Sequence, residues 1–167
     1  LKKLKKFGIY HPSLEHDACG VGFVASTEGK KSRKIVEFGI QALKAVWHRG
    51  AVDADGKTGD GAGIHIEIPK DFFIERIENA GRRHGKGMIC VGMIFLPRND
   101  YVAQEKCKTL VEDELLSKNY YIYRWRQVPV NTRVLGIKAE NNRPEIVQVI
   151  FKSNNENLKD NDLERDL

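Results

Sequence analysis

A nearly continuous apolar run, MICVGMIFL at residues 88–96, constrains the fold of this 167-residue chain more than any other stretch. It is too short for a typical helix and carries no helical spacing of polar residues, so it is typical of a buried strand. A strand that is apolar on both faces needs cover on both faces. The run therefore predicts a central strand of a sheet that other elements enclose.

Periodicity and capping residues predict the remaining elements. Ser32 can cap a helix, and the apolar spacing that follows continues to about residue 47. Further helices are expected at 71–80 and at 99–117, where Asn99 is the expected cap; strands are expected at 21–25, 64–68, 120–130 and 146–151. Because helices and strands alternate, an α+β layered sandwich and an α/β doubly wound sheet both remain open on the pattern alone.

The composition excludes several classes of function. The net charge is +5, and much of the excess lies in two basic runs, 2–6 and 30–34, which have no aromatic platform and are typical of solvated surface rather than of nucleic-acid binding. No apolar run reaches about 18 residues, so no membrane span is expected. Three cysteines without Cys-x-x-Cys spacing argue against a metal site or a disulfide framework, and the expected setting is a reducing cytoplasm.

Of the three cysteines, Cys19 has the most unusual position. It begins an apolar run directly after a polar, basic leader, residues 1–18, and Gly20 beside it allows close approach to the backbone. A free thiol has a pKa of about 8.5, so a nucleophilic role needs a base. A cysteine in such a run is more often a core residue, and Cys90 and Cys107, which lie in the predicted strand and helix, are interpreted as core.

The glycine-rich loop at residues 50–63 resembles two ligand-binding loops without matching either. Its Gly-Lys-Thr at 56–58 lacks the spacing of a phosphate-binding P-loop. An EF-hand would need carboxylates where Ala51 and Ala62 stand, so calcium is not expected. Arg49, just before the loop, carries a guanidinium fork that could bind a carboxylate or brace the backbone.

Four segments together resemble the large chain of glutamate synthases. They are EHDACGVGFVA at 15–25, HRGAVDADGKTGDGAGIHIEIP at 48–69, GMIFLPRN at 92–99 and RWRQVPVN at 124–131. They occur in the order of the family and cover nearly the whole chain. Each segment alone is moderately specific, and their combination makes a chance match improbable.

The resemblance implies a class II glutamine amidotransferase domain of the N-terminal nucleophile type. Such domains are α+β proteins, four-layer α/β/β/α sandwiches with antiparallel sheets, of which residues 19–167 would be the first portion. In this family the leader is removed. Cleavage between Ala18 and Cys19 would make Cys19 the first residue, with its thiol as nucleophile and its own α-amine as base. An α-amine has a pKa of about 7.7–8.0, which suits this task, whereas the amide nitrogen of an unprocessed Cys19 does not.

The resemblance implies less for the rest of the site. Arg49 is carried over as a supporting residue near the nucleophile, and the loop 58–63 as lining or bracing the cleft, with no chemical role. The family's oxyanion-hole Asn-Gly pair and its substrate-carboxylate ligands lie beyond Leu167, so no residue here takes those roles. An oxyanion donor typically contributes about 10²–10³ in rate, so these residues alone are expected to be nearly inactive.

For the complete enzyme, the resemblance implies that ammonia from glutamine passes to 2-oxoglutarate in downstream domains. Those domains would hold FMN and an iron–sulfur cluster, and this chain itself would hold no cofactor. The expected partners are glutamine, the downstream domains and, as a further candidate, a reductase small subunit, with no nucleic acid and no membrane. Two alternatives stay open: a class II amidotransferase with a different acceptor, and a non-catalytic basic binding module.

Overall fold

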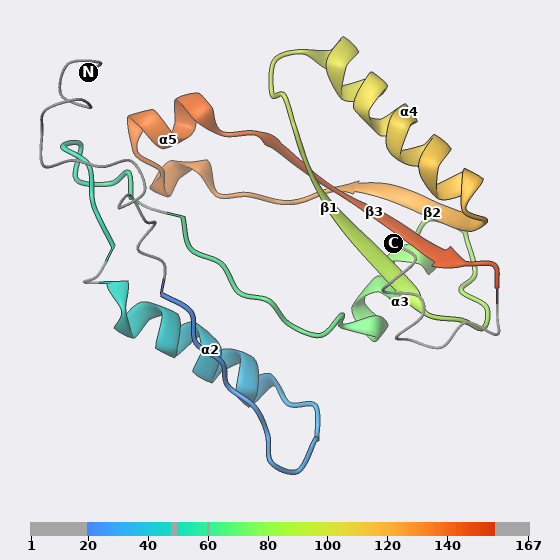
Figure 1. The fold of residues 1–167 in the computed structure, drawn as a ribbon, viewed down its shortest axis with the longest axis horizontal. Helices are drawn as coiled ribbons and strands as arrows, with labels where there is room; N and C mark the ends of the chain where they lie inside the picture. The colour runs from blue at the N-terminus through green and yellow to red at the C-terminus, as the bar shows by residue number, and fades with distance from the viewer. Residues whose placement is uncertain (1–19, 48–49, 60, 156–167) are drawn as a thin grey trace, which may run out of the picture. The chain divides into compact units, whose positions relative to one another are not determined.

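The computed structural model describes residues 20–47, 50–59 and 61–155. These residues divide into two compact units, one within 1–51 and 61–64, the other within 52–60 and 65–167 (Figure 1). The expected leader, 1–18, lies outside the described residues, and so does the end of the polar tail, 156–167.

The first unit is built around one helix. Helix α2 spans Arg33–Ala45, and the Ser32 side chain caps it by accepting a hydrogen bond from the Lys34 amide at 3.2 Å, which confirms the predicted helix and its cap. Gly39 lies close to Ile64, so that a Cβ at this position would come within 3.2 Å of the Ile64 side chain.

Two predicted strands are absent, and both predictions are wrong. Residues 21–25 form no strand, and the side chains of Val21 and Phe23 are 97% and 93% exposed. Residues 64–68 form no strand either, with Ile64 and Ile66 exposed. In both segments the sequence has strand character, but no described strand pairs with it, and an extended segment gains its backbone hydrogen bonds only from a partner.

The second unit contains an antiparallel sheet of three strands in the order β1–β3–β2. Strand β1 spans Ile89–Leu96, β2 spans Tyr120–Gln127 and β3 spans Glu145–Ser153. Residues 147–151 of β3 are buried without a break. The strand at 88–96 is thus confirmed as a strand but not as the central one: β1 is an edge strand with Met93 and Phe95 exposed, and β3 holds the centre.

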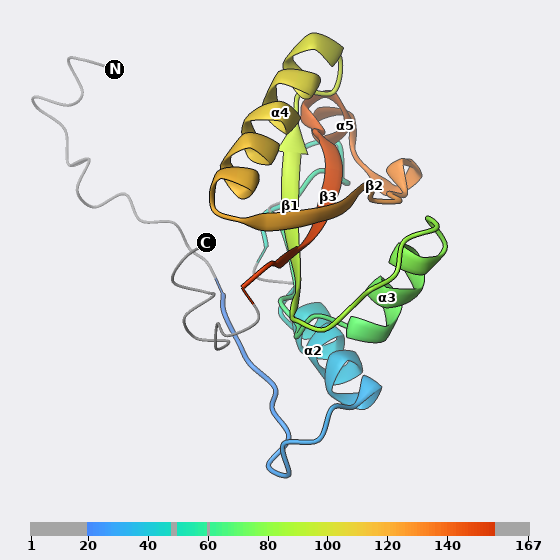
Figure 2. The same cartoon turned by 90° about the vertical axis from the view of Figure 1, so that its right-hand side faces the viewer.

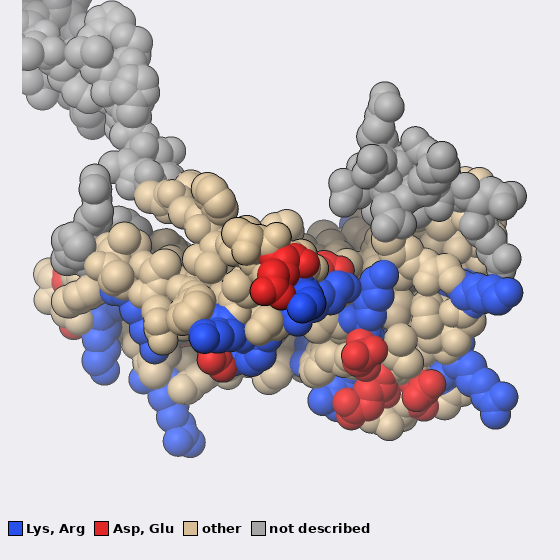
Figure 3. All heavy atoms as spheres, turned by 90° about the horizontal axis from the view of Figure 1, so that it is seen from below, with Lys and Arg blue, Asp and Glu red and all other residues tan. Residues whose placement is uncertain are grey.

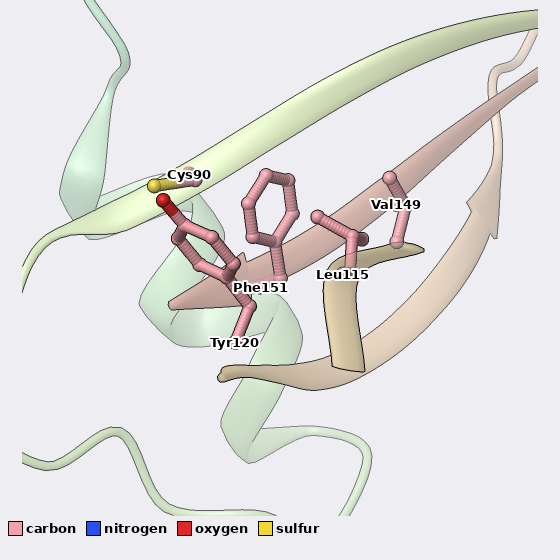
Figure 4. Close-up of a cluster of buried hydrophobic side chains, with 5 residues drawn as sticks. All are labelled: Cys90, Leu115, Tyr120, Val149 and Phe151. Carbon is pink, nitrogen blue, oxygen red and sulfur yellow. The ribbon is translucent and has the colours of Figure 1, made fainter. Parts of the chain in front are cut away.

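Two helices cover opposite faces of this sheet (Figure 2). Helix α4 spans Tyr101–Ser117 and packs on the face that carries Val149 and Phe151, while α3 spans Lys70–Glu78 and packs around Ile150. The α4 cluster, drawn in Figure 4, consists of Cys90, Leu115, Tyr120, Val149 and Phe151. The α3 cluster consists of Phe73, Ile77, Ile89, Tyr123 and Ile150. Both helices were predicted, although α4 is capped by Asp100 rather than by Asn99.

A bulge in β2 decides which side chains reach α3. Ile122 pairs with Phe151 and Arg124 pairs with Ile150, so Tyr123 is the extra residue. An extra residue shifts the alternation of faces by one position. Tyr123 and Arg124 consequently both lie on the α3 face, whereas Trp125 lies on the α4 face and donates to Glu112 of α4 at 2.5 Å.

The long connection from β2 to β3 holds two short elements, the 3₁₀ helix Thr132–Val134 and α5, Ile137–Asn142. Neither was predicted. With helices packed on an antiparallel sheet, the second unit agrees with the α+β interpretation and not with a doubly wound parallel sheet.

The surface drawn in Figure 3 carries both signs of charge. Asp and Glu side chains lie between the Lys and Arg side chains on this face. No helix among the described residues combines the length and apolar character needed to cross a membrane.

Candidate functional site

The predicted nucleophile, Cys19, and the predicted supporting residue, Arg49, lie outside the described residues. The described part of the candidate site is the glycine-rich loop, whose residues 50–59 and 61–63 lie between α2 and α3. Its geometry shows how this part of the chain is held.

The loop forms a narrow hairpin, residues 52–59. Val52 and Gly59 make an antiparallel bridge, and the Asp53 amide donates to the Thr58 carbonyl at 2.7 Å. At the tip, the Gly56 amide donates to the Asp53 carbonyl at 2.9 Å, and Gly56 has a φ of 67°. A left-handed φ of this kind favours glycine, so Gly56 has a conformational reason to stand here.

The Asp55 carboxylate organises the tip of this hairpin. It accepts hydrogen bonds from the Thr58 hydroxyl at 2.6 Å, the Thr58 amide at 2.7 Å and the Lys57 amide at 2.9 Å. These bonds, that of the Thr58 hydroxyl foremost, hold the pKa of Asp55 well below its usual range. The stabilisation is therefore complete above the ordinary carboxyl pKa and is lost only in strong acid. These amides face a carboxylate, so they are not available to cradle a phosphate, in line with the rejection of a P-loop.

The hairpin is docked on the start of helix α5. The Ile137 amide also donates to Asp55, and the Lys138 ammonium lies 2.5 Å from an Asp53 carboxylate oxygen. A Cβ added at Gly136 would come within 2.1 Å of the Thr58 hydroxyl and 2.3 Å of an Asp55 carboxylate oxygen. The docking thus requires that residue 136 have no side chain.

Helix α5 is itself fixed to the connection between β1 and α4. The Arg98 guanidinium donates to the Glu140 carboxylate at 2.6 Å and to the Glu140 carbonyl at 2.9 Å. Arg143 donates to the same carboxylate at 3.1 Å and is the main reason that the pKa of Glu140 is lowered. Helix α5, on which the hairpin docks, is therefore tied to the segment that directly follows β1.

The sequence predicted the loop as part of the site but did not predict its contact with Gly136 and the start of α5. The part of the loop taken as lining the cleft, 58–63, begins at Thr58, which the hairpin holds in place. Gly136 lies far from the loop in sequence and carries no motif, although an Asp three residues before a Thr is a pattern that often forms such local hydrogen bonds. The ends of the hairpin lead directly, along the chain, to Arg49 on one side and to residues 60–63 on the other.

Of the two described cysteines, Cys90 is confirmed as a core residue, whereas Cys107 belongs to neither buried cluster. Cys90 is buried in the α4 cluster, and burial raises the pKa of its thiol to about 11. The Cys90 thiol is thus neutral at physiological pH. The folded state loses stability through this buried group only as the pH rises above the ordinary thiol pKa, where the unfolded chain ionises first. Cys107 is half-buried on α4. Among the described residues, no group of His, Cys, Asp and Glu side chains is arranged to hold a metal ion.

Thiol labelling provides a direct check of this assignment. In the native full-length protein at neutral pH, we expect Cys90 to react with iodoacetamide at least about 10²-fold more slowly than a free thiol, because it is both buried and protonated. Peptide mapping by mass spectrometry measures the rate at each cysteine, and labelling in denaturant is the control. Rapid native labelling of Cys90 would contradict its place in the core.

Comparison with known proteins identifies relatives of one kind. Residues 19–167 match the family described as glutamine amidotransferases class-II. The chain is 55% identical to the glutamate synthase [NADPH] large chain of Azospirillum brasilense over 158 residues, which cover 95% of this chain and 10% of that protein.

More distant relatives carry similar names. The glutamate synthase [NADPH] large chain of Bacillus subtilis is 35% identical over 164 residues, 94% of this chain and 10% of that protein. The chloroplastic ferredoxin-dependent glutamate synthase of Spinacia oleracea is 37% identical over 158 residues, 92% of this chain and 9% of that protein. The chain thus spans about a tenth of the length of the curated relatives it matches.

Proposed function

Because the chain belongs to the class-II glutamine amidotransferases, a family of enzymes, we propose that it supplies the glutaminase part of a glutamate synthase. The observation that carries the proposal is the position of the family match, which begins at Cys19, together with relatives that are glutamate synthases. The reaction is hydrolysis of the side-chain amide of glutamine to glutamate and ammonia.

Cys19 acts as the nucleophile once the bond from Ala18 to Cys19 has been cut. The new α-amine takes the thiol proton, and the thiolate attacks the amide carbon of glutamine to form a bond from sulfur to carbon. The bond from carbon to nitrogen then breaks, and ammonia leaves with the proton returned by the amine. Water hydrolyses the thioester, which releases glutamate and restores the thiol. Residues 1–18 are in this view a propeptide-like leader.

Arg49 and the loop from Thr58 to Gly63 support this site without taking part in proton transfer. The hairpin at 52–59 supports this assignment, because it is closed by its own hydrogen bonds and its two ends continue along the chain toward these residues. Precise placement of groups around the substrate is itself a large part of catalysis. Arg49 is thus a supporting residue, and its guanidinium fork suits a carboxylate or a backbone carbonyl.

For the fold of the whole domain we propose the four-layer α/β/β/α sandwich. The antiparallel sheet with α4 on one face would supply one sheet and one helical layer. On the other face, α3 covers only part of the sheet, and Met93 and Phe95 of β1 are left exposed. An open apolar sheet face of this kind suits packing against a second sheet.

In the full-length protein, the ammonia would pass to 2-oxoglutarate in downstream domains of the same protein. FMN and an iron–sulfur cluster belong to those domains and would supply the reducing electrons. The described residues do not fit a cluster, because Cys90 is buried with a raised pKa and clusters are held by thiolates. A reductase small subunit is a further partner, and the proposed setting is the cytoplasm.

The proposal is tested by the first residue of the mature protein. Intact-mass measurement and N-terminal sequencing of the full-length protein should find Cys19 at the start of the chain, and this protein should release ammonia from glutamine. An Ala18→Pro substitution at the cleavage site should leave the leader attached and the glutaminase inactive, because the nitrogen of Cys19 then remains an amide. Glutamine hydrolysis by a chain that still carries residues 1–18 would refute the mechanism.

A further inference from the structure

Three arginines line a hollow in the second unit that the proposed hydrolysis does not use. The hollow has a volume of about 640 Å³ and lies between the end of α3 and the end of β2. None of the described residues that line it is acidic. The lining residues are Arg76, Asn79, Arg124, Arg126, Gln127, Val128, Pro129 and Val130.

The two arginines of β2 are fixed by neutral partners. Because of the bulge, Arg124 reaches α3, where it donates to the Arg76 carbonyl at 3.1 Å. Arg126 donates to the side-chain oxygen of Gln148 at 2.6 Å. These hydrogen bonds orient the guanidinium groups and leave their positive charge uncompensated by the acceptor.

The third arginine shares an aromatic ring with Arg126. The guanidinium carbons of Arg76 and Arg126 lie 4.9 Å and 5.4 Å from the centre of the Phe72 ring. The Nε atom of Arg76 is buried and has no hydrogen-bond partner in the part of the chain that the structure describes. The carboxylate of Glu75 lies 3.9 Å from the Arg76 guanidinium and also accepts from Asn79 at 3.4 Å. Two positively charged guanidinium groups are thus held beside the Phe72 ring, and the Glu75 carboxylate neutralises them only weakly.

This arrangement has the properties of an anion site. Like charges held close together repel, and a bound anion removes the repulsion. Guanidinium forks bind phosphate and carboxylate oxygens in pairs, which point charges such as Lys do less well. The volume of the hollow is in the range of small-molecule sites. We propose that the hollow binds a compact dianion, either a phosphate group or a pair of carboxylates on one small molecule.

Protection from arginine modification tests the proposal in the full-length protein. Phenylglyoxal reacts with accessible guanidinium groups, and peptide mapping gives the rate at each arginine. With inorganic phosphate or malonate present at constant ionic strength, we expect Arg124 and Arg126 to react about tenfold more slowly. Arg33, an exposed residue of α2 paired with Glu37, is the matched control and should react at an unchanged rate.

Substitutions distinguish specific anion binding in the hollow from nonspecific attraction of anions to a positively charged surface. The double variant R124Q/R126Q should weaken anion binding, measured by calorimetry, at least about tenfold, while R33Q should not change it. Protection by phosphate alone or by malonate alone supports the proposal and identifies the chemistry. Equal modification rates of Arg124 and Arg126 with and without the two anions would overturn the proposal. Full protection of these arginines without any added anion would also overturn it, because an acidic group of the protein would then fill the hollow. Phenylglyoxal labelling of the unmodified protein tests the proposal even if the double variant fails to fold.

Discussion

Replacing Cys19 by serine in the full-length protein is expected to lower the rate of glutamine hydrolysis by at least about 10³-fold. A hydroxyl has a much higher pKa than a thiol, so the α-amine that suffices for sulfur cannot activate it to the same degree. Synthesis of glutamate from added ammonia should continue, because that reaction does not need the amidotransferase thiol. Ammonia release from glutamine and ammonia-dependent synthesis are measured on the same preparation.

A matched control separates the role of Cys19 from that of thiols in general. Cys107 lies half-buried on α4 and has no predicted role in the chemistry, so C107S should retain glutaminase activity close to that of the unmodified protein. Intact mass must show that the serine variant begins at residue 19, so that loss of activity is not loss of processing. Hydrolysis by correctly processed C19S within tenfold of the unmodified rate would remove Cys19 from the mechanism.

Local signals in the sequence were enough to predict α2, α3 and α4, although not the short α5. Ser32 begins α2 because its side chain replaces a hydrogen bond that the first turn lacks, and this information lies within a few residues. The same holds for α4, where Asn99 and Asp100 offer two adjacent caps and the structure uses the second. A one-residue error of this kind leaves the buried face of the helix unchanged.

Strands proved harder because pairing is not local. The run at 88–96 indicates a strand, but its apolar residues do not reveal that β1 is at the edge and that β3 is enclosed on both sides. Residues 21–25 and 64–68 show the opposite case, since their apolar side chains stay exposed where no described strand pairs with them. Order in a sheet depends on residues far away in the chain, which a pattern cannot report.

The candidate site, too, contains one part that the sequence predicted and one part that it did not. Cys19 and Arg49 were predicted from resemblance, and both lie outside the described residues, so their placement stays a prediction. The contact between the hairpin and Gly136 could not be predicted, because nothing in the sequence links Asp55 to a glycine in the connection from β2 to β3. Only the folded chain brings them together.

Substituting alanine for Gly136 is expected to disturb that contact strongly. Gly136 has a φ of −75°, which any residue adopts, so the substitution adds a methyl group without backbone strain. That methyl group would lie 2.6 Å from the Thr58 amide nitrogen, in addition to its overlap with the Thr58 and Asp55 side chains. Overpacking of this kind typically costs about 1–3 kcal/mol. Since the crowded atoms include backbone, the hairpin must move away from α5.

Displacement of the hairpin should appear in catalysis, if the loop supports the proposed site. A shift of about 1 Å can cost about 10²-fold in rate, so we expect the kcat/KM for glutamine to fall at least about tenfold in G136A, while ammonia-dependent synthesis is retained. Hydrogen exchange at residues 52–59 should rise in parallel. The control is G85A, where the added Cβ meets only the end of the Lys152 side chain, at 3.9 Å. Unchanged glutamine hydrolysis in G136A, with exchange at the hairpin increased, would show that the docked hairpin stabilises the domain without supporting its chemistry.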